Sequence, residues 1–249
     1  MLRGAGTALN VVTVLVGSGI GVLLGDRMPA RTREVVTDGL GLVVLLVAAL
    51  SALAVRDPAL GAAVGTSAPV LIVLGAVLLG GIAGSLVRVE DRLAAMGDAV
   101  RRRLPGAQGS VPERARFIEG FVSAALLFCV GPLTILGSLD DGLGHGIDKL
   151  ALKSTLDGVA SVAFAASRGW GVAASALVVL VVQGSLTVLG AALGSLLTTA
   201  QISALTATGG VLLIGVGLRL LRVRQVTVAD LLPALLMAPL LVSLVAAVR

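Results

Sequence analysis

The sequence predicts an all-α integral membrane protein with about eight transmembrane helices. Of its 249 residues, 57% are hydrophobic and 13% are charged, and the mean hydropathy is +1.05. Soluble domains are about 45–50% apolar and about 25% charged, so a soluble fold of this size has too little interior for so much apolar surface. The composition also excludes a disordered chain and a coiled coil. The one cysteine, Cys129, excludes an intrachain disulfide.

Eight apolar segments approach the length of about 20 residues that crosses the hydrocarbon core as a helix. The first is too long and too rich in glycine for a signal peptide, so we interpret it as a true span. The fifth is the least certain to cross, and if it is re-entrant the count falls to seven. The spans, which form a single polytopic membrane domain over 1–249, are 5–25, 38–55, 64–87, 117–138, 149–168, 171–197, 205–222 and 229–248.

The placement of arginine and lysine predicts the orientation. With eight alternating spans, fourteen of the nineteen basic residues fall on one side of the membrane. By the positive-inside rule, this side is the cytoplasm, and both termini lie outside. The longest cytoplasmic connection is the basic loop 88–116. Within it, 88–104 is amphipathic, which predicts a helix on the inner leaflet, with partner binding as the alternative.

Three stretches of the chain resemble one another, which predicts internal repeats. Each has a glycine pair four residues apart, a loop, and a polar residue followed by glycine. The pairs are Gly17 and Gly21, Gly80 and Gly84, and Gly190 and Gly194; the steps that follow are Asp38-Gly39, Glu119-Gly120 and Thr208-Gly209. Because an odd number of spans separates the last unit from the others, it is expected to be inverted, as in many secondary transporters.

The segment 148–161 carries charge into a predicted span. Lys149, Lys153, Asp157 and Ser161 are four residues apart and share one helical face, with Ser154 beside it. Asp157 is expected near mid-depth, where a charge costs about 2.5–3.5 kcal/mol, so it should face a partner or a cavity. Two hypotheses remain open: Lys153 and Asp157 pair with each other and only stabilise the packing of the helix bundle, or they line a polar site that binds an ion.

Other polar positions extend this candidate site. Glu119 and Asp38 lie at the starts of predicted spans. They are candidates for the site, but the helix dipole by itself favours a carboxylate at a helix start. Asn10 and Gln183 place amides inside spans, where most such groups bond to another helix. The pair Gly131-Pro132 predicts a kink or break in the fourth span, which would either expose backbone carbonyls or serve packing.

The assembled motifs resemble the domain of unknown function 554 family of bacterial multi-pass inner-membrane proteins. The resemblance covers nearly the whole chain. It implies membrane location and a shared fold but no substrate, cofactor or catalytic residue. The motif positions are Cys129, Gly131, Pro132, Lys153, Ser154, Asp157, Gly158, Gln183 and Gly184. The runs that carry it are GTALN, FIEGFVSAALLFCVGPLTILGSLDDGL, LALKSTLDGVASVAFA, VVQGSLTVLG and ALTATGGVLLIGVGL.

These observations favour a transporter or channel for a small ion or metabolite, with a polar site around Lys153 and Asp157. The alternative is a non-transporting scaffold or assembly partner that uses the basic loop 88–116. We expect no enzymatic activity, because HExxH and GxGD motifs are absent and His145, the single histidine, lies in an outer loop. No metal or cofactor is expected. The expected partners are the lipid bilayer and an unknown small solute or ion, without nucleic acid, and homo-oligomerisation remains open.

Overall fold

The structure, a computed structural model, describes residues 3–25, 27–103, 110–130, 132–193 and 197–248, and within these ranges it contains helices and no strand. The predicted all-α class is therefore confirmed. The elements are α1 (Ala5–Gly25), α2 (Ala30–Ala52), η1 (Leu53–Arg56), α3 (Pro58–Val64), α4 (Ala68–Val87), α5 (Val89–Arg102), α6 (Val111–Cys129), α7 (Pro132–Leu143), α8 (Asp148–Arg168), α9 (Gly171–Ala174), α10 (Ala176–Leu193), α11 (Thr199–Leu220), η2 (Val228–Leu231) and α12 (Ala234–Val248).

Six helical segments of the described chain are long and apolar enough to cross a membrane. They are Ala5–Gly25, Ala30–Arg56, Ala68–Val87, Gly171–Ala192, Thr199–Leu220 and Val228–Val248. The pair formed by α6 and α7 makes a seventh if it is one span bent by 61°. The predicted fifth span, α8, is a helix of 21 residues, but its charged residues keep it outside this set. The chain is thus a multi-pass membrane protein with a span count close to the predicted seven or eight.

Several helices begin earlier than the predicted spans. Helix α2 begins at Ala30 rather than at 38, α6 at Val111 rather than at 117, and α11 at Thr199 rather than at 205. The predicted spans do not include these first turns, because hydropathy marks only the apolar part of a helix, whereas polar first turns continue it beyond that part. The start of α11 is set by a capping box, in which the side chains of Thr198 and Gln201 accept each other's backbone N–H.

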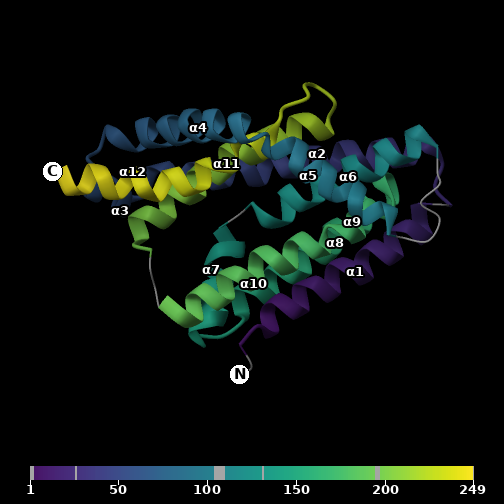
Figure 1. Ribbon diagram of the computed structural model, residues 1–249, viewed down its shortest axis with the longest axis horizontal. Helices are drawn as coiled ribbons and strands as arrows, with labels where there is room; N and C mark the ends of the chain where they lie inside the picture. Colours follow the sequence, from purple (N-terminus) through teal and green to yellow (C-terminus); the bar gives the residue numbers. More distant parts are fainter. Residues whose placement is uncertain (1–2, 26, 104–109, 131, 194–196, 249) are drawn as a thin grey trace. The chain divides into compact units, whose positions relative to one another are not determined.

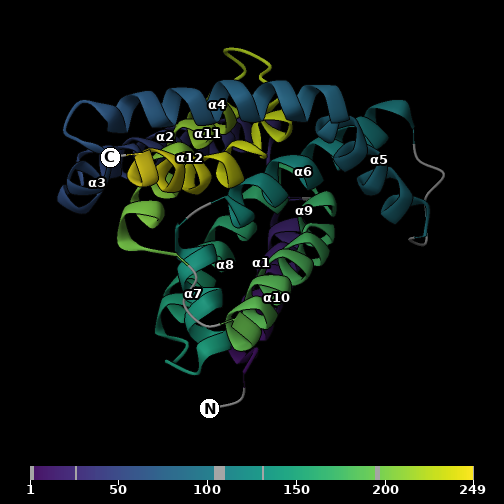
Figure 2. The same cartoon turned by 60° about the vertical axis from the view of Figure 1, so that its left-hand side comes forward.

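The described helices form two compact units, each assembled from separated stretches of the predicted single domain. Unit 1 consists of Met1–Gly41, Arg92–Cys129 and Leu133–Ser195. Unit 2 consists of Leu42–Asp91, Val130–Pro132 and Leu196–Arg249. In unit 1, α1, α8 and α10 lie side by side, and in unit 2, α4 packs with α12 and α12 with α11 (Figures 1 and 2).

In unit 1, α1 and α8 are parallel and nearly touch along their length. A Cβ atom added at Gly17 would lie 2.3 Å from the carbonyl oxygen of Gly158, and one at Gly21 would lie 2.2 Å from that of Val162. Since the contacted residue number rises along both helices, they run in the same direction. The small residues therefore allow the α1 backbone to rest directly on α8.

In unit 2, glycines on α4 allow a similarly close approach. A Cβ atom at Gly80 would lie 2.2 Å from the backbone nitrogen of Ala234, and one at Gly84 would lie 1.9 Å from the carbonyl oxygen of Asp230. The glycines of the predicted repeats thus contact elements remote in sequence. Gly194 lies outside the described residues, and the internal repeat itself stays a prediction.

Candidate functional site

The charged face of α8 is buried in unit 1. Lys153 and Asp157 are the sixth and tenth residues of the helix, and their residues are 6% and 7% exposed. The Lys153 Nζ atom lies 2.5 Å from Asp157 Oδ2, as the four-residue spacing predicts. A buried ion pair of this kind recovers its large desolvation cost only with further hydrogen bonds. The polar groups around Lys153 and Asp157 therefore determine whether the pair is stable in the interior.

Asn10 of α1 is the third member of the site. Its Nδ2 atom donates to Asp157 Oδ2 over 3.0 Å, so that oxygen accepts from both Asn10 and Lys153. The close packing of α1 on α8 explains how an amide 147 positions away in sequence reaches the carboxylate. Asn10 is fully buried, and its Oδ1 atom has no hydrogen-bond partner within the described part of the chain.

Gln183 of α10 is a second buried amide with unused hydrogen-bonding capacity. It is fully buried, and neither its Oε1 nor its Nε2 atom has a partner among the residues that the structure describes. One turn further along α10, Thr187 Oγ1 lies 3.2 Å from Thr7 Oγ1 of α1. Helix α10 packs against α1 and runs antiparallel to it (Figure 1).

The uncharged polar groups of unit 1 divide into satisfied and unsatisfied ones. Ser154 and Ser161, both predicted as site residues, donate to the carbonyl oxygens of Leu150 and Gly158 on their own helix. The hydroxyls of Ser18 and Ser138 are buried without a partner in the described chain. An unpaired buried polar group costs about 1–3 kcal/mol, so these two hydroxyls are unfavourable unless water or another polar group reaches them.

Two predicted site residues lie apart from the pair. Glu119 does not open a helix, because α6 begins eight residues before it; its Oε2 atom instead pairs with Arg168 at the end of α8. Arg168 is eleven residues from Asp157, which corresponds to about 16 Å along a helix. Asp38 is exposed in the third turn of α2, so the helix-start explanation is wrong for it as well.

The predicted break in the fourth span falls between α6 and α7. Helix α6 ends at Cys129 and α7 begins at Pro132, with the two helices bent by 61°. Gly131 lies outside the described residues. Cys129 is half-buried and lies near enough to Lys153 and Asp157 to interact with their charges. The break therefore lies beside the polar site. The rings of Phe128 and Phe164, with centroids 6.5 Å apart, pack α6 onto α8 near this point.

Asp141 of α7 is a buried carboxylate that the sequence did not single out as a candidate. It is 2% exposed, and its two carboxylate oxygens accept the backbone N–H groups of Gly4 and Gly6 at 3.0 and 3.1 Å. A carboxylate is favoured at a helix N-terminus, so Asp141 anchors the start of α1. The spacing of Thr134, Ser138 and Asp141, which gives α7 one polar face, was the available signal.

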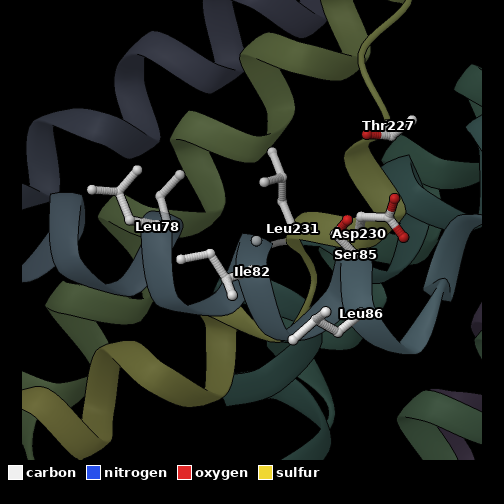
Figure 3. Close-up of a pocket in the computed structure, with 9 residues that line it drawn as sticks. Leu78, Ile82, Ser85, Leu86, Thr227, Asp230 and Leu231 are labelled. Atoms are coloured by element: carbon white, nitrogen blue, oxygen red, sulfur yellow. The ribbon is translucent and has the colours of Figure 1, made fainter.

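Unit 2 has its own ion pair and a surface groove. Glu90 pairs with Arg219 and also accepts the backbone N–H of Ala229, while Asp230 Oδ1 accepts the N–H of Glu90. Figure 3 shows the groove beside this cluster, with a volume of about 450 Å³. Its lining residues are Val77, Leu78, Gly81, Ile82, Ser85, Leu86, Thr227, Asp230 and Leu231. The walls are mostly apolar side chains, which makes the groove a poorer candidate for a polar solute than the interior of unit 1.

No metal ligand cluster was predicted, and in the described ranges no three His, Cys, Asp or Glu side chains come together as metal ligands would. Among the residues that the structure describes, the contacts of the pair bring together one carboxylate, Asp157, one ammonium, Lys153, and the neutral amide of Asn10. Such a set suits a small ion or a polar solute better than a tightly held divalent metal, which prefers several carboxylates.

Comparison with known proteins identifies relatives along almost the entire chain. The family described as "Protein of unknown function (DUF554)" matches residues 5–243. The "Uncharacterized membrane protein YdfK" of Bacillus subtilis (strain 168) is 26% identical over 240 residues, which is 96% of each chain. The "Uncharacterized protein YqgA" of Escherichia coli (strain K12) is 30% identical over 233 residues, or 94% of each chain. No solved structure matches.

Proposed function

The chain belongs to the DUF554 family of proteins of unknown function, and from this premise and the site in unit 1 we propose that it is a transporter or channel for a small ion or metabolite. Its bacterial relatives, one named a membrane protein, support a location in the bacterial inner membrane. The proposal assigns it no enzymatic activity.

The observation that carries the proposal is the buried Lys153–Asp157–Asn10 network with unused amide atoms around it. If the pair served packing alone, selection would have little reason to leave Asn10 Oδ1 and the whole Gln183 amide unpaired in an apolar interior. A solute or water molecules that enter the region would satisfy them. Ionisable groups inside membrane proteins usually mark such pathways.

The break beside the site supports the same proposal. A helix interrupted between Cys129 and Pro132 leaves backbone carbonyl groups of the last turn of α6 without helical partners, and one of them, that of Phe128, accepts the Thr134 hydroxyl instead at 3.1 Å. Broken helices at a polar site are a common construction in secondary transporters. Glu119 and Arg168, at the far end of α8, would then form a charged pair at one mouth of the pathway.

The scaffold alternative depends on free arginines in the loop 88–116. Among the described residues, four of them are already engaged. Arg88 pairs with Asp91, and Arg116 donates to the carbonyl oxygen of Ser167. Arg102 of α5 and Arg114 of α6 both bind the buried carboxylate of Asp98. The role of Arg102 and Arg114 in holding α5 against α6 weakens the case for a docking surface there. Co-purification of a defined partner that is lost on deletion of 97–114 would favour the alternative.

A flux screen in proteoliposomes tests the transport proposal. The purified chain is reconstituted and tested with labelled cations, anions and amino acids, alongside an Asp157→Asn variant and an Asp140→Asn control. Asp140 pairs with Lys149 at an exposed position, so the control removes an equivalent Lys–Asp pair outside the site. We expect flux of at least one solute that Asp157→Asn abolishes and Asp140→Asn retains. Absence of flux for every class of solute would refute the proposal.

A further inference from the structure

The unused groups around Asp157 indicate which class of solute the proposed site accepts. Two buried amides of unit 1 have atoms without partners in the described chain: the Oδ1 atom of Asn10, the residue that binds Asp157, is a free acceptor, and Gln183 has one free acceptor, Oε1, and one free donor, Nε2. The Asn10 amide cannot easily be turned over, because its Nδ2 atom is held by Asp157 Oδ2. Free acceptors beside a carboxylate favour a positively charged ligand over an anion.

The charge balance of the site limits that ligand further. Lys153 and Asp157 together are neutral, and one carboxylate with neutral oxygens is a weak site for a divalent cation. A monovalent cation that binds Asp157 would lie next to the Lys153 ammonium. Two like charges at this distance in a buried site repel strongly, so one of them must leave or lose its charge.

We propose that the site binds a monovalent cation in exchange for a proton, with the Lys153 ammonium serving as an internal substitute for that cation when the site is empty. This inference rests on the proposed transport function and specifies its substrate class. When no cation is bound, the Lys153 ammonium lies against the Asp157 carboxylate and takes the place of the cation. When the cation binds the Asp157 carboxylate, the ammonium of Lys153 releases one proton to water and becomes a neutral amine. The site has zero net charge before binding and zero net charge after it.

Other ionisable groups near α8 lie at its ends or at the helix break. Helix α1 contributes none along Ala5–Gly25, and α9 contributes none along Gly171–Ala174. Besides the pair itself, the ionisable groups that the neighbouring elements bring include Cys129, Glu119 and Arg116 of α6, with Arg168 opposite Glu119, and Asp140 and Asp141 of α7. Cys129 lies near enough to the pair to interact with its charges, and Lys153 is the cationic group in contact with Asp157, so the proposal assigns the exchanged proton to Lys153.

The test measures proton and cation movement in the same proteoliposomes. A pH-sensitive dye is enclosed, and Li⁺, Na⁺, K⁺ or choline is added outside, while uptake of radioactive Na⁺ is followed in parallel. For the wild type, we expect proton release coupled to entry of at least one of the three metal cations and no response to choline. Asp157→Asn should reduce both signals to those of protein-free vesicles, and Asp140→Asn should leave both unchanged.

Two further variants separate the roles of the residues even if Asp157→Asn does not fold. Lys153→Gln should retain cation uptake but lose the coupled proton movement, so that uptake comes to depend on the membrane potential. Asn10→Ala, which removes a free acceptor and leaves the ion pair, should raise the cation concentration needed for half-maximal exchange.

The outcomes distinguish this inference from the transport function on which it rests. If the wild type moves an anion, an amino acid or another solute but none of the three cations, the exchange inference is overturned and the transport function stands. If no solute moves at all, both are wrong. Persistence of cation-coupled proton movement in a folded Asp157→Asn protein, or of proton coupling in Lys153→Gln, would also overturn the inference.

Discussion

Single carboxylates in this protein hold together segments that are far apart in sequence, and Asp141 is the clearest case. Its two oxygens accept the N–H groups of Gly4 and Gly6, more than 130 positions earlier in the chain. We predict that Asp141→Asn destabilises the protein by about 1–3 kcal/mol, because one backbone N–H group loses its acceptor and the favourable charge at the start of α1 is lost. Thermal unfolding in detergent measures the change. Asp38→Asn, at an exposed position, is the control; an equal loss in both would contradict the assignment.

Asp98 provides a prediction of pH dependence outside the predicted spans. The guanidinium groups of Arg102 and Arg114 lower the pKa of the Asp98 carboxyl below its usual value of 3.8 in spite of its burial. A lowered pKa in the folded state means that the stabilisation is complete above the ordinary pKa and is lost as the pH falls through the folded value. The wild type should therefore melt at a higher temperature than Asp98→Asn between pH 5 and 7.

The difference in melting temperature should shrink progressively as the pH falls below about 3.8, the ordinary pKa of aspartate. Asp91→Asn is the matched control, since Asp91 forms an exposed pair with Arg88 of the kind that contributes little. A difference between wild type and Asp98→Asn that does not change with pH would show that the carboxylate charge is not what joins α5 to α6.

At the scale of elements, the contact of α1 with α8 depends on glycines whose hydrogen atoms face a backbone. A methyl group at Gly17 or Gly21 would meet carbonyl oxygens of α8 at 2.3 and 2.2 Å, so α1 would have to move away. We predict that Gly17→Ala and Gly21→Ala each cost about 1–3 kcal/mol in stability. They should also weaken any function that needs the bond between Asn10 and Asp157.

Gly19 is the control within the same helix. A Cβ atom there would have no neighbour within 4 Å, so Gly19→Ala should leave stability unchanged or raise it by up to about 1 kcal/mol through helix propensity. The three variants are compared by thermal unfolding of the purified protein in detergent. Equal effects at Gly17, Gly19 and Gly21 would show that helix propensity, and not the contact with α8, decides the outcome.

The elements and the site differ in how far the sequence could predict them. Hydropathy located the apolar helices because that signal is local, but it does not register the polar first turns of α2 and α6, which begin before the predicted spans. The i to i+4 spacing predicted the Lys153–Asp157 pair for the same local reason. The partners Asn10 and Asp141 could not be paired with their targets, because each bond joins helices separated by more than 130 residues.

The arrangement of α1 and α8 bears on the topology of the whole molecule. Both helices have 21 residues, a length of about 30 Å that matches the hydrocarbon core, and they run parallel in direct contact. If α1 crosses the membrane, α8 reaches the same depth beside it, because Lys153 and Asp157 neutralise each other and Asn10 donates a hydrogen bond to Asp157. Parallel spans must be separated by an odd number of crossings, and α2, α4 and the bent pair of α6 and α7 supply three. This supports eight crossings.

The last prediction tests whether α8 crosses. His145 lies just before α8 and Trp170 just after it, and both are exposed. In a Cys129→Ser background, which removes the one native cysteine, His145→Cys should react with a membrane-impermeant thiol reagent in intact cells. Trp170→Cys should react only after the membrane is permeabilised, because the positive-inside rule places the arginine-rich end of α8 in the cytoplasm. The Cys129→Ser protein without an added cysteine should give no signal. Labelling of both positions from the same side would mean that α8 is re-entrant, and the count of crossings would fall to seven.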